Sequence, residues 1–296
     1  MWQVDTTYNS IRIRLDPTKL LNKVDPSNRE AWISLGAFAE NCILSASGFS
    51  LMCDIQHDST GINLTFSKST AAHKEKYAKW IIQRKTTRTP FKKEELSTEH
   101  QTIIKNFDVN ITYYPLNSEY GKIIADNLYS SNIAQLNNST KLQELSEWTI
   151  TSRKEEKQRK DGLSPSDLGL NSFSKAFFYA LFNKEKIQSH RFINIAQRNT
   201  LKQVNNCSGF IIITSARNNK EEWIKSGRLL QRLWLKLTEL NIRVHPMSQS
   251  IEENYYPELK EKLNINNKEI QMIIRVGYSK PRKDCSARSD LKINNG

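Results

Sequence analysis

Two uninterrupted apolar stretches in the second half of the chain constrain its fold more than any other feature. Residues 209–215 read GFIIITS and residues 270–278 read IQMIIRVGY. Strands that are apolar at nearly every position are typical of strands covered on both faces. A chain with two of them must supply helices that cover a central sheet. The segment 220–239, between the two stretches, has apolar residues at helical spacing and is one candidate for such a cover.

The remaining segments show both strand and helix patterns, which predicts a mixed α+β fold with sheets flanked by helices. We expect Asn28 to cap a helix whose small residues Gly36 and Ala39 let another element approach closely. The turn-rich, charged stretch 151–172 is expected to be a mobile or lid-like connection. The expected strands are 10–15, 49–57, 61–67, 109–114, 209–215 and 270–278, and the expected helices are 29–47, 69–83, 98–106, 119–148, 173–182, 220–239 and 256–263. The aromatic helix 173–182 is expected to be buried, and residues 243–250 are expected to form a loop.

Charge and cysteine content narrow the class of protein. The chain has 44 Lys and Arg against 31 Asp and Glu, a net charge of +13, which favours an anionic ligand or surface. No apolar run approaches the roughly 18 residues of a membrane span, and the first residues do not resemble a secretory signal. The four scattered cysteines do not form a disulfide framework, so we expect a cytoplasmic protein. Histidines and cysteines are too dispersed for a metal site, and none is predicted.

The most specific local pattern is the basic segment Arg84, Lys85, Thr86, Thr87 and Arg88. Two guanidinium groups and a hydroxyl at alternate positions, where the chain leaves a helix, could converge on one anion. Arginine forms bidentate hydrogen bonds with phosphate oxygens, and threonine adds a neutral donor. By itself the segment is also compatible with a solvated basic turn.

Two further segments are weaker candidates. The basic tail contains Lys280, Arg282, Lys283 and Arg288, and it directly follows the last apolar strand. The loop Pro246–Gln249 could face a ligand with its backbone amides and Ser248, although an ordinary surface turn explains it equally well.

The order of these motifs resembles that of the nitroreductase superfamily of FMN-dependent oxidoreductases, and specifically its Acg-like branch. In this branch two nitroreductase-like halves are fused in one chain as a pseudo-dimer. The segment IIQRKTTRTPF is similar to the family's Arg-x-Ser/Thr-x-Arg motif for the flavin phosphate. The other segments that carry the resemblance are DPSNREAWISLGAFAENCILSASG, ELSEWTITSRKEEKQRKDGLS, EEWIKSGRLLQRLWLKLTELNIRVHPMSQSIE and IQMIIRVGYSKPR.

The resemblance implies a set of cofactor-binding residues. Arg84, Thr86 and Arg88, with Lys85 between them, would hold the FMN phosphate. Arg288, Ser286 and Arg282 would complete this clamp from the tail. Met247, Ser248 and Gln249 would face the isoalloxazine ring. The branch also has a Pro-Ser-x-x-Asn-x-Gln-Pro-Trp segment before its first strand. No Asn-x-Gln precedes Trp2, so we expect its flavin contacts to be missing from residues 1–296.

The resemblance also implies the activity. Hydride would pass from NAD(P)H through FMN to a nitro compound, quinone or similar small electron-poor acceptor, and no catalytic side chain is expected because the flavin performs the chemistry. Two alternatives stay open: a catalytically silent flavin-sequestering protein, and a basic protein that binds nucleic acid or a membrane surface. The second rests on charge alone, because no basic strand face is interleaved with aromatic residues. We therefore expect neither nucleic acid nor membrane as a partner.

The same resemblance predicts the domain organisation. Residues 1–66 would form a truncated N-terminal half, and residues 67–296 a C-terminal half with a lid at about 151–206. The fused chain would act as a monomeric pseudo-dimer or as a homodimer.

Overall fold

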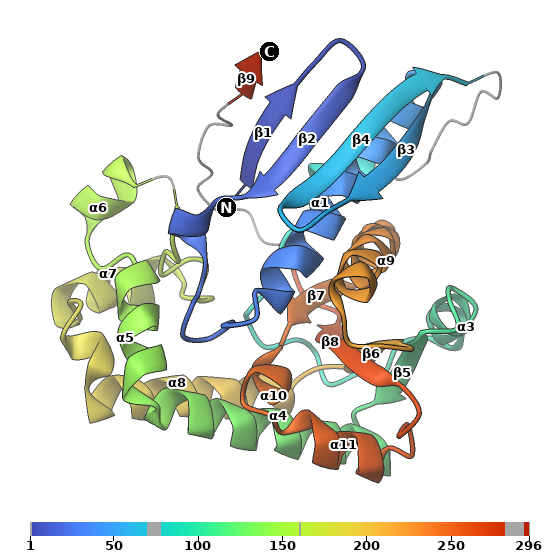
Figure 1. The fold of residues 1–296 in the computed structure, drawn as a ribbon. Coiled ribbons are helices and arrows are strands. Elements are labelled where there is room, and N and C mark those ends of the chain that lie inside the picture. Colours follow the sequence, from blue (N-terminus) through green and yellow to red (C-terminus); the bar gives the residue numbers. More distant parts are fainter. Residues whose placement is uncertain (1, 70–77, 160, 282–292, 296) are drawn as a thin grey trace. The chain divides into compact units, whose positions relative to one another are not determined.

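The computed structural model describes residues 2–69, 78–159, 161–281 and 293–295. The chain forms two compact units (Figure 1). The first contains Met1–Arg84, Ser215–Leu240 and Asp290–Gly296, and the second contains Lys85–Thr214 and Asn241–Ser289. None of the helices within the described ranges is long and apolar enough to cross a membrane.

The first unit is a five-stranded sheet that packs against the helix α1 (Arg29–Ser47), which in turn packs against α9 (Lys220–Glu239). The strand order is β3-β4-β2-β1-β9; β9 is parallel to β1, and the other neighbours are antiparallel. Ile13, Ile62 and Leu64 of the sheet are fully buried against Leu35 and Ala39 of α1. The elements are β1 (Trp2–Thr6), β2 (Ser10–Leu15), η1 (Pro17–Lys19), α1 (Arg29–Ser47), β3 (Leu51–His57), β4 (Gly61–Lys68), α2 (Ala78–Ile81), α9 (Lys220–Glu239) and β9 (Ile293–Asn295).

The second unit contains a four-stranded sheet of order β5-β6-β8-β7, in which β5–β6 and β7–β8 are antiparallel. Ile124 and Leu128 of α4 pack on Phe210 and Ile212 of β6. The elements are α3 (Thr98–Lys105), β5 (Ile111–Pro115), α4 (Glu119–Asn137), α5 (Ser139–Trp148), α6 (Arg153–Gln158), α7 (Ser172–Leu181), η2 (Lys186–Gln188), α8 (His190–Val204), β6 (Gly209–Ser215), β7 (Arg243–Pro246), α10 (Gln249–Glu252), α11 (Tyr256–Lys262) and β8 (Glu269–Gly277).

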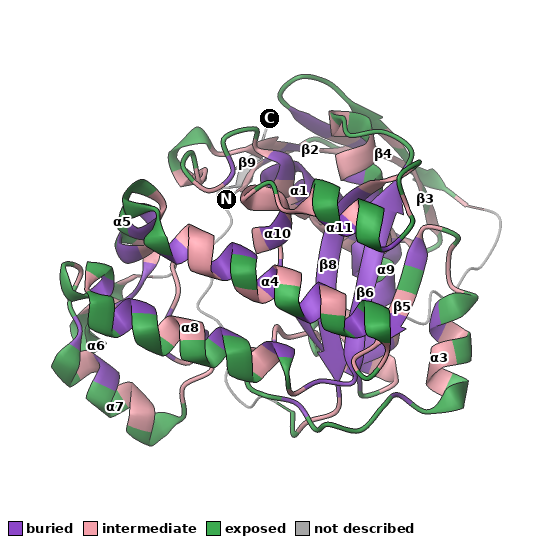
Figure 2. Ribbon diagram, turned by 90° about the horizontal axis from the view of Figure 1, so that it is seen from below, coloured by how far each residue is buried: buried purple, intermediate pink, exposed green. Residues whose placement is uncertain are grey.

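The two apolar stretches form the centre of this sheet, as the sequence predicted. Every residue of β6 is buried, and β8 is buried from Ile270 onward (Figure 2). The mixed α+β architecture with mostly antiparallel sheets flanked by helices confirms the predicted fold class.

Several local predictions were wrong for identifiable reasons. The helix predicted over 119–148 breaks at Asn138, whose side chain accepts hydrogen bonds from the amides of Thr140 and Lys141 and begins a new helix. The segment 243–246, expected to be a loop, is the edge strand β7. Helix α8 had no predicted counterpart. Of the helix predicted over 69–83, residues 70–77 lie outside the described residues.

Two further expectations failed at the level of single side chains. Asn28 adopts a left-handed conformation and makes no side-chain cap; the carboxylate of Asp25 accepts from the amides of Glu30 and Ala31 instead. The aromatic segment 173–182 is helical but only partly buried, since Phe173 is 73% exposed.

The close approach predicted at Gly36 is confirmed, and its partner is α9. A Cβ atom at Gly36 would lie 2.2 Å from the carbonyl oxygen of Ile224, and one at Gly227 of α9 would lie 1.9 Å from that of Ile33. The two helices thus meet backbone to backbone through a reciprocal pair of glycines.

We therefore expect Gly36→Ala to lower the free energy of unfolding by roughly 1–3 kcal/mol, because the backbone of α9 must move. Gly48→Ala is the matched control: its Cβ would meet only a carbonyl oxygen at 3.3 Å, in right-handed geometry. Urea denaturation measures both variants. Equal stability of the two would contradict this packing.

Candidate functional site

Residues 85–88, the part of the predicted phosphate segment that follows Arg84, lie beside β7 in the second unit. Thr86 forms a parallel bridge with Val244, and the amide of Thr87 donates to the carbonyl oxygen of Val244 at 2.9 Å. The segment therefore extends the sheet beyond its edge strand. Its backbone is held in place, which a solvated turn would not require.

A buried arginine, which the sequence patterns did not indicate as a functional residue, binds the backbone of this segment. Arg275 of β8 has no exposed surface, and its guanidinium donates to the carbonyl oxygens of Thr87 (3.3 Å) and Thr89 (2.8 Å). It also donates to Gln203 (2.8 Å) at the end of α8 and lies 4.0 Å from the ring centre of Phe91. In the sequence, the feature that could have indicated this role is a single arginine within the apolar run IQMIIRVGY.

Arg88 connects this segment to the turn-rich stretch expected to form a lid. Its Nη1 donates to the carbonyl oxygen of Asp167 at 2.9 Å, and its own carbonyl accepts from Gln203 Nε2 at 2.6 Å. Gly169 has φ of +86°, and a Cβ there would lie 3.2 Å from the carbonyl carbon of Arg88. Asp167 is in turn held by the Ser164 hydroxyl at 2.6 Å. The stretch Ser164–Gly169 is thus packed on Arg88.

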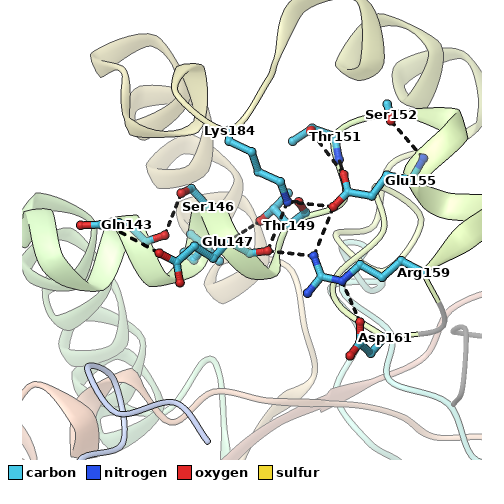
Figure 3. A network of polar contacts seen from close by, with 11 residues as sticks. Gln143, Ser146, Glu147, Thr149, Thr151, Ser152, Glu155, Arg159, Asp161 and Lys184 are labelled. Carbon is cyan, nitrogen blue, oxygen red and sulfur yellow. Dashed lines mark hydrogen bonds and ion pairs between the residues drawn. The ribbon is translucent and has the colours of Figure 1, made fainter. Parts of the chain in front are cut away.

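A polar network braces the beginning of the same stretch (Figure 3). Glu155 of α6 forms ion pairs with Arg159 (3.2 Å) and Lys184 (3.0 Å). Both cations also donate to the carbonyl oxygen of Glu147 in the last turn of α5. These contacts anchor α6 to α5.

The loop after β7 leads directly into α10. Met247 is buried, and its amide donates to the carbonyl oxygen of Ile273 at 2.8 Å. The Ser248 hydroxyl donates to Glu252 at 2.6 Å. The amide of Met247 and the hydroxyl of Ser248 are therefore engaged within the protein, whereas the Gln249 side-chain oxygen is buried with no hydrogen-bond partner among the described residues.

His245 of β7 adds an electrostatic constraint. Burial, together with the positive charges of Arg275 and Arg88, lowers the pKa of His245 well below its usual value of 6.5. Burial also lowers the pKa of Arg275, to about 10, so this guanidinium remains charged at neutral pH. At neutral pH the site therefore contains a neutral imidazole that is influenced by two positively charged guanidiniums.

The other predicted residues are distributed differently. Arg84 belongs to the first unit, where its guanidinium lies 4.4 Å from the ring centre of Trp234. Lys85 is half-buried at the start of the second unit. Arg282, Ser286 and Arg288 lie outside the described residues. The structure thus places Thr86 and Arg88 along β7, the strand that leads into the loop from Met247 to Gln249.

Two hydroxyl groups, which can donate to an anion, and one amide oxygen, which can only accept, remain available near β7 to a polar cofactor. Around β7, the described part of the chain has buried and unpartnered polar atoms at Thr87 Oγ1, Gln249 Oε1 and Ser250 Oγ. A buried polar atom without a partner is destabilising and is commonly satisfied by water or ligand. Across the described ranges, no group of three or more His, Cys, Asp or Glu side chains is arranged to hold a metal ion.

Comparison with known proteins identifies the family. The model of the nitroreductase family matches residues 81–278, about two thirds of the chain, and the chain belongs to the nitroreductase family. Among curated proteins, none matches the chain.

Solved structures with similarity include the FMN and NADPH-dependent nitroreductase NfnB from Sphigopyxis sp. strain HMH, at 13% identity, covering 72% of this chain and 95% of that chain with a TM-score of 0.45. A second is FMN-dependent nitroreductase NfnB from Mycobacterium smegmatis in complex with NADPH, at 14% identity over 69% of this chain and 87% of that chain, TM-score 0.42. A third is a nitroreductase with bound FMN from Bacteroides fragilis, at 8% identity over 73% of this chain and 95% of that chain, TM-score 0.40.

The neutral state of His245 predicts a pH dependence of stability. The unfolded chain takes up a proton at this residue below about pH 6.5, whereas the folded chain does not. The free energy of unfolding should therefore fall as the pH drops below about 6.5, with His245 contributing up to about 1.4 kcal/mol per pH unit. Urea titrations at several pH values on the native protein and on His245→Gln measure the difference in slope. An identical slope in the variant would contradict a buried neutral imidazole.

Proposed function

We propose that this chain binds FMN and transfers hydride from NAD(P)H through the flavin to a nitro compound, quinone or similar small electron-poor acceptor. The observation that carries the proposal is the fixed backbone around Arg88. Three interactions hold this backbone in place. The backbone of Thr86 bridges to β7, and the Arg275 guanidinium donates to the carbonyl groups on both sides of Arg88. The side-chain amide of Gln203 donates to the carbonyl oxygen of Arg88. A fixed backbone lowers the entropy lost when Arg88 and Thr86 bind an anion.

We assign the cofactor contacts as follows. The residues that would hold the FMN phosphate are Arg84, Lys85, Thr86 and Arg88, with Arg282, Ser286 and Arg288 from the tail. Met247, Ser248 and Gln249 would lie against the isoalloxazine ring. The bound flavin supplies the redox chemistry, by accepting a hydride and passing it on.

The chain's own residues contribute binding and electrostatics. Arg88 brings positive charge to a phosphate that has nearly two negative charges. Arg275 adds a second, buried positive charge behind the same segment. Because His245 stays neutral, it adds no charge that varies with pH near neutrality. Met247 and Phe91 are both buried and limit the access of water to this part of the site.

We further propose that the chain belongs to the Acg-like branch and is a fused pseudo-dimer. Its halves would be residues 1–66 and 67–296, with the lid at about 151–206. The contact between Arg88 and Asp167 supports the lid, because it brings the turn-rich stretch onto the phosphate segment. The fused chain would act as a monomer or as a homodimer.

The same contact favours one alternative, a catalytically silent protein that sequesters flavin. A lid packed on Arg88 through Gly169 and Asp167 would retain the cofactor and restrict the entry of an acceptor.

The proposal is tested by the absorbance spectrum of the freshly purified protein with and without added FMN, followed by NAD(P)H oxidation with a quinone or a nitroarene. A flavin spectrum with turnover is the expected result. A flavin spectrum without turnover indicates the sequestering protein, and the absence of any FMN binding would overturn both.

The assignment of Arg88 has a sharper test. Arg88→Ala should weaken FMN binding about tenfold to a hundredfold, since each charge-assisted contact contributes roughly 1.5–3 kcal/mol. Riboflavin has no phosphate, so its binding should hardly change. Fluorescence titration of both flavins measures the effect, and Arg191→Ala, at an exposed arginine of α8, is the matched control. An equal loss for both flavins would indicate a folding defect, and no loss would remove Arg88 from the site.

A further inference from the structure

Two arginines of α9 share one buried carboxylate of α1 in the first unit. Glu40 is fully buried. Arg228 Nε donates to one of its oxygens at 2.7 Å, and Arg232 Nε donates to the other. The two helices lie side by side (Figure 1).

The charges in this cluster do not balance. Arg228 and Arg232 are four residues apart on one helix face, where like charges repel each other. One arginine is enough to neutralise one carboxylate, and a single guanidinium can serve both carboxylate oxygens. The cluster therefore has one positive charge more than the pairing of Glu40 requires.

The hydrogen-bond geometry leaves donors available. Both arginines bind Glu40 through Nε, and no contact within the described part of the chain engages their Nη groups. The side chains of Arg228 and Arg232 remain 33% and 46% exposed. Each guanidinium thus has one edge fixed inside the protein while part of its surface reaches solvent.

The helix pair also holds the two guanidiniums in fixed positions. Gln231, between them in sequence, donates to the side-chain oxygen of Asn41 at 2.7 Å, next to Glu40 on α1. The backbones of α1 and α9 are in contact at Gly36 and Gly227. Two guanidiniums that are already ordered lose little entropy when they bind an oxyanion.

We propose that Arg228 and Arg232, oriented by Glu40, form a binding site for a phosphate monoester, held by their Nη groups. The excess positive charge and the free Nη donors suit an anionic, tetrahedral phosphate group. The site uses none of the residues assigned to FMN and does not depend on the proposed flavin chemistry.

The test measures the thermal stabilisation by inorganic phosphate at constant ionic strength, with chloride as the reference salt. In Arg232→Gln, Glu40 keeps Arg228 as its partner, so the buried carboxylate is not left unpaired. We expect this variant to melt within a few degrees of the native protein in chloride and to bind phosphate at least about tenfold more weakly. Arg12→Gln makes the same charge change at a half-buried arginine that is paired with Asp58, and this variant should bind phosphate like the native protein.

Further measurements distinguish the possible sources of the phosphate group, and they distinguish the Arg228–Arg232 site from the proposed flavin site. NADPH differs from NADH by one phosphate monoester. If that group is the natural ligand, Arg232→Gln weakens NADPH binding and leaves NADH binding unchanged; if the phosphate comes from elsewhere, both nucleotides bind as before while inorganic phosphate is still lost. Phosphate binding that is abolished by Arg88→Ala and retained in Arg232→Gln would assign the anion to the flavin site and overturn this proposal. The absence of any phosphate effect in the native protein would overturn it too.

Discussion

The buried guanidinium of Arg275 is the interaction on which the second unit's site depends. A charge without exposed surface is tolerated only when hydrogen bonds replace the water it has lost. Here backbone carbonyl oxygens from two segments supply them, Thr87 and Thr89 on one side and Gln203 and Asn206 on the other. These hydrogen bonds connect the central strand β8 both to the segment around Arg88 and to the end of α8.

This arrangement determines what the neighbouring side chains can do. Because the carbonyl groups on both sides of Arg88 are fixed, its side chain leaves the backbone from a defined position, and Gln203 holds its carbonyl oxygen as well. The same positive charge acts on His245 and favours its neutral form. A substitution at Arg275 would therefore disturb the segment, α8 and the histidine together, which argues against treating it as an ordinary core position.

The first unit is stabilised by a different kind of interaction, the close contact between the backbones of α1 and α9. Glycines at positions 36 and 227 remove the side chains that would separate α1 from α9. Glu40 then becomes inaccessible to water and requires a cationic partner from the opposite helix. That two arginines fulfil this role, with exposed surface remaining on each, distinguishes the cluster from a simple structural ion pair.

Local sequence patterns determined most of the secondary structure of this protein, but they determined few of its tertiary contacts. The apolar runs predicted β6 and β8, because a strand that is buried on both faces has apolar residues at nearly every position. The small residue Gly36 indicated that another element approaches α1 closely. The sequence did not determine which partner completes each group: that Asp25 rather than Asn28 caps α1, that Thr86 pairs with β7, or that Arg275 binds carbonyl oxygens up to 188 residues away. Such choices depend on which groups are buried together, and only the tertiary structure decides that.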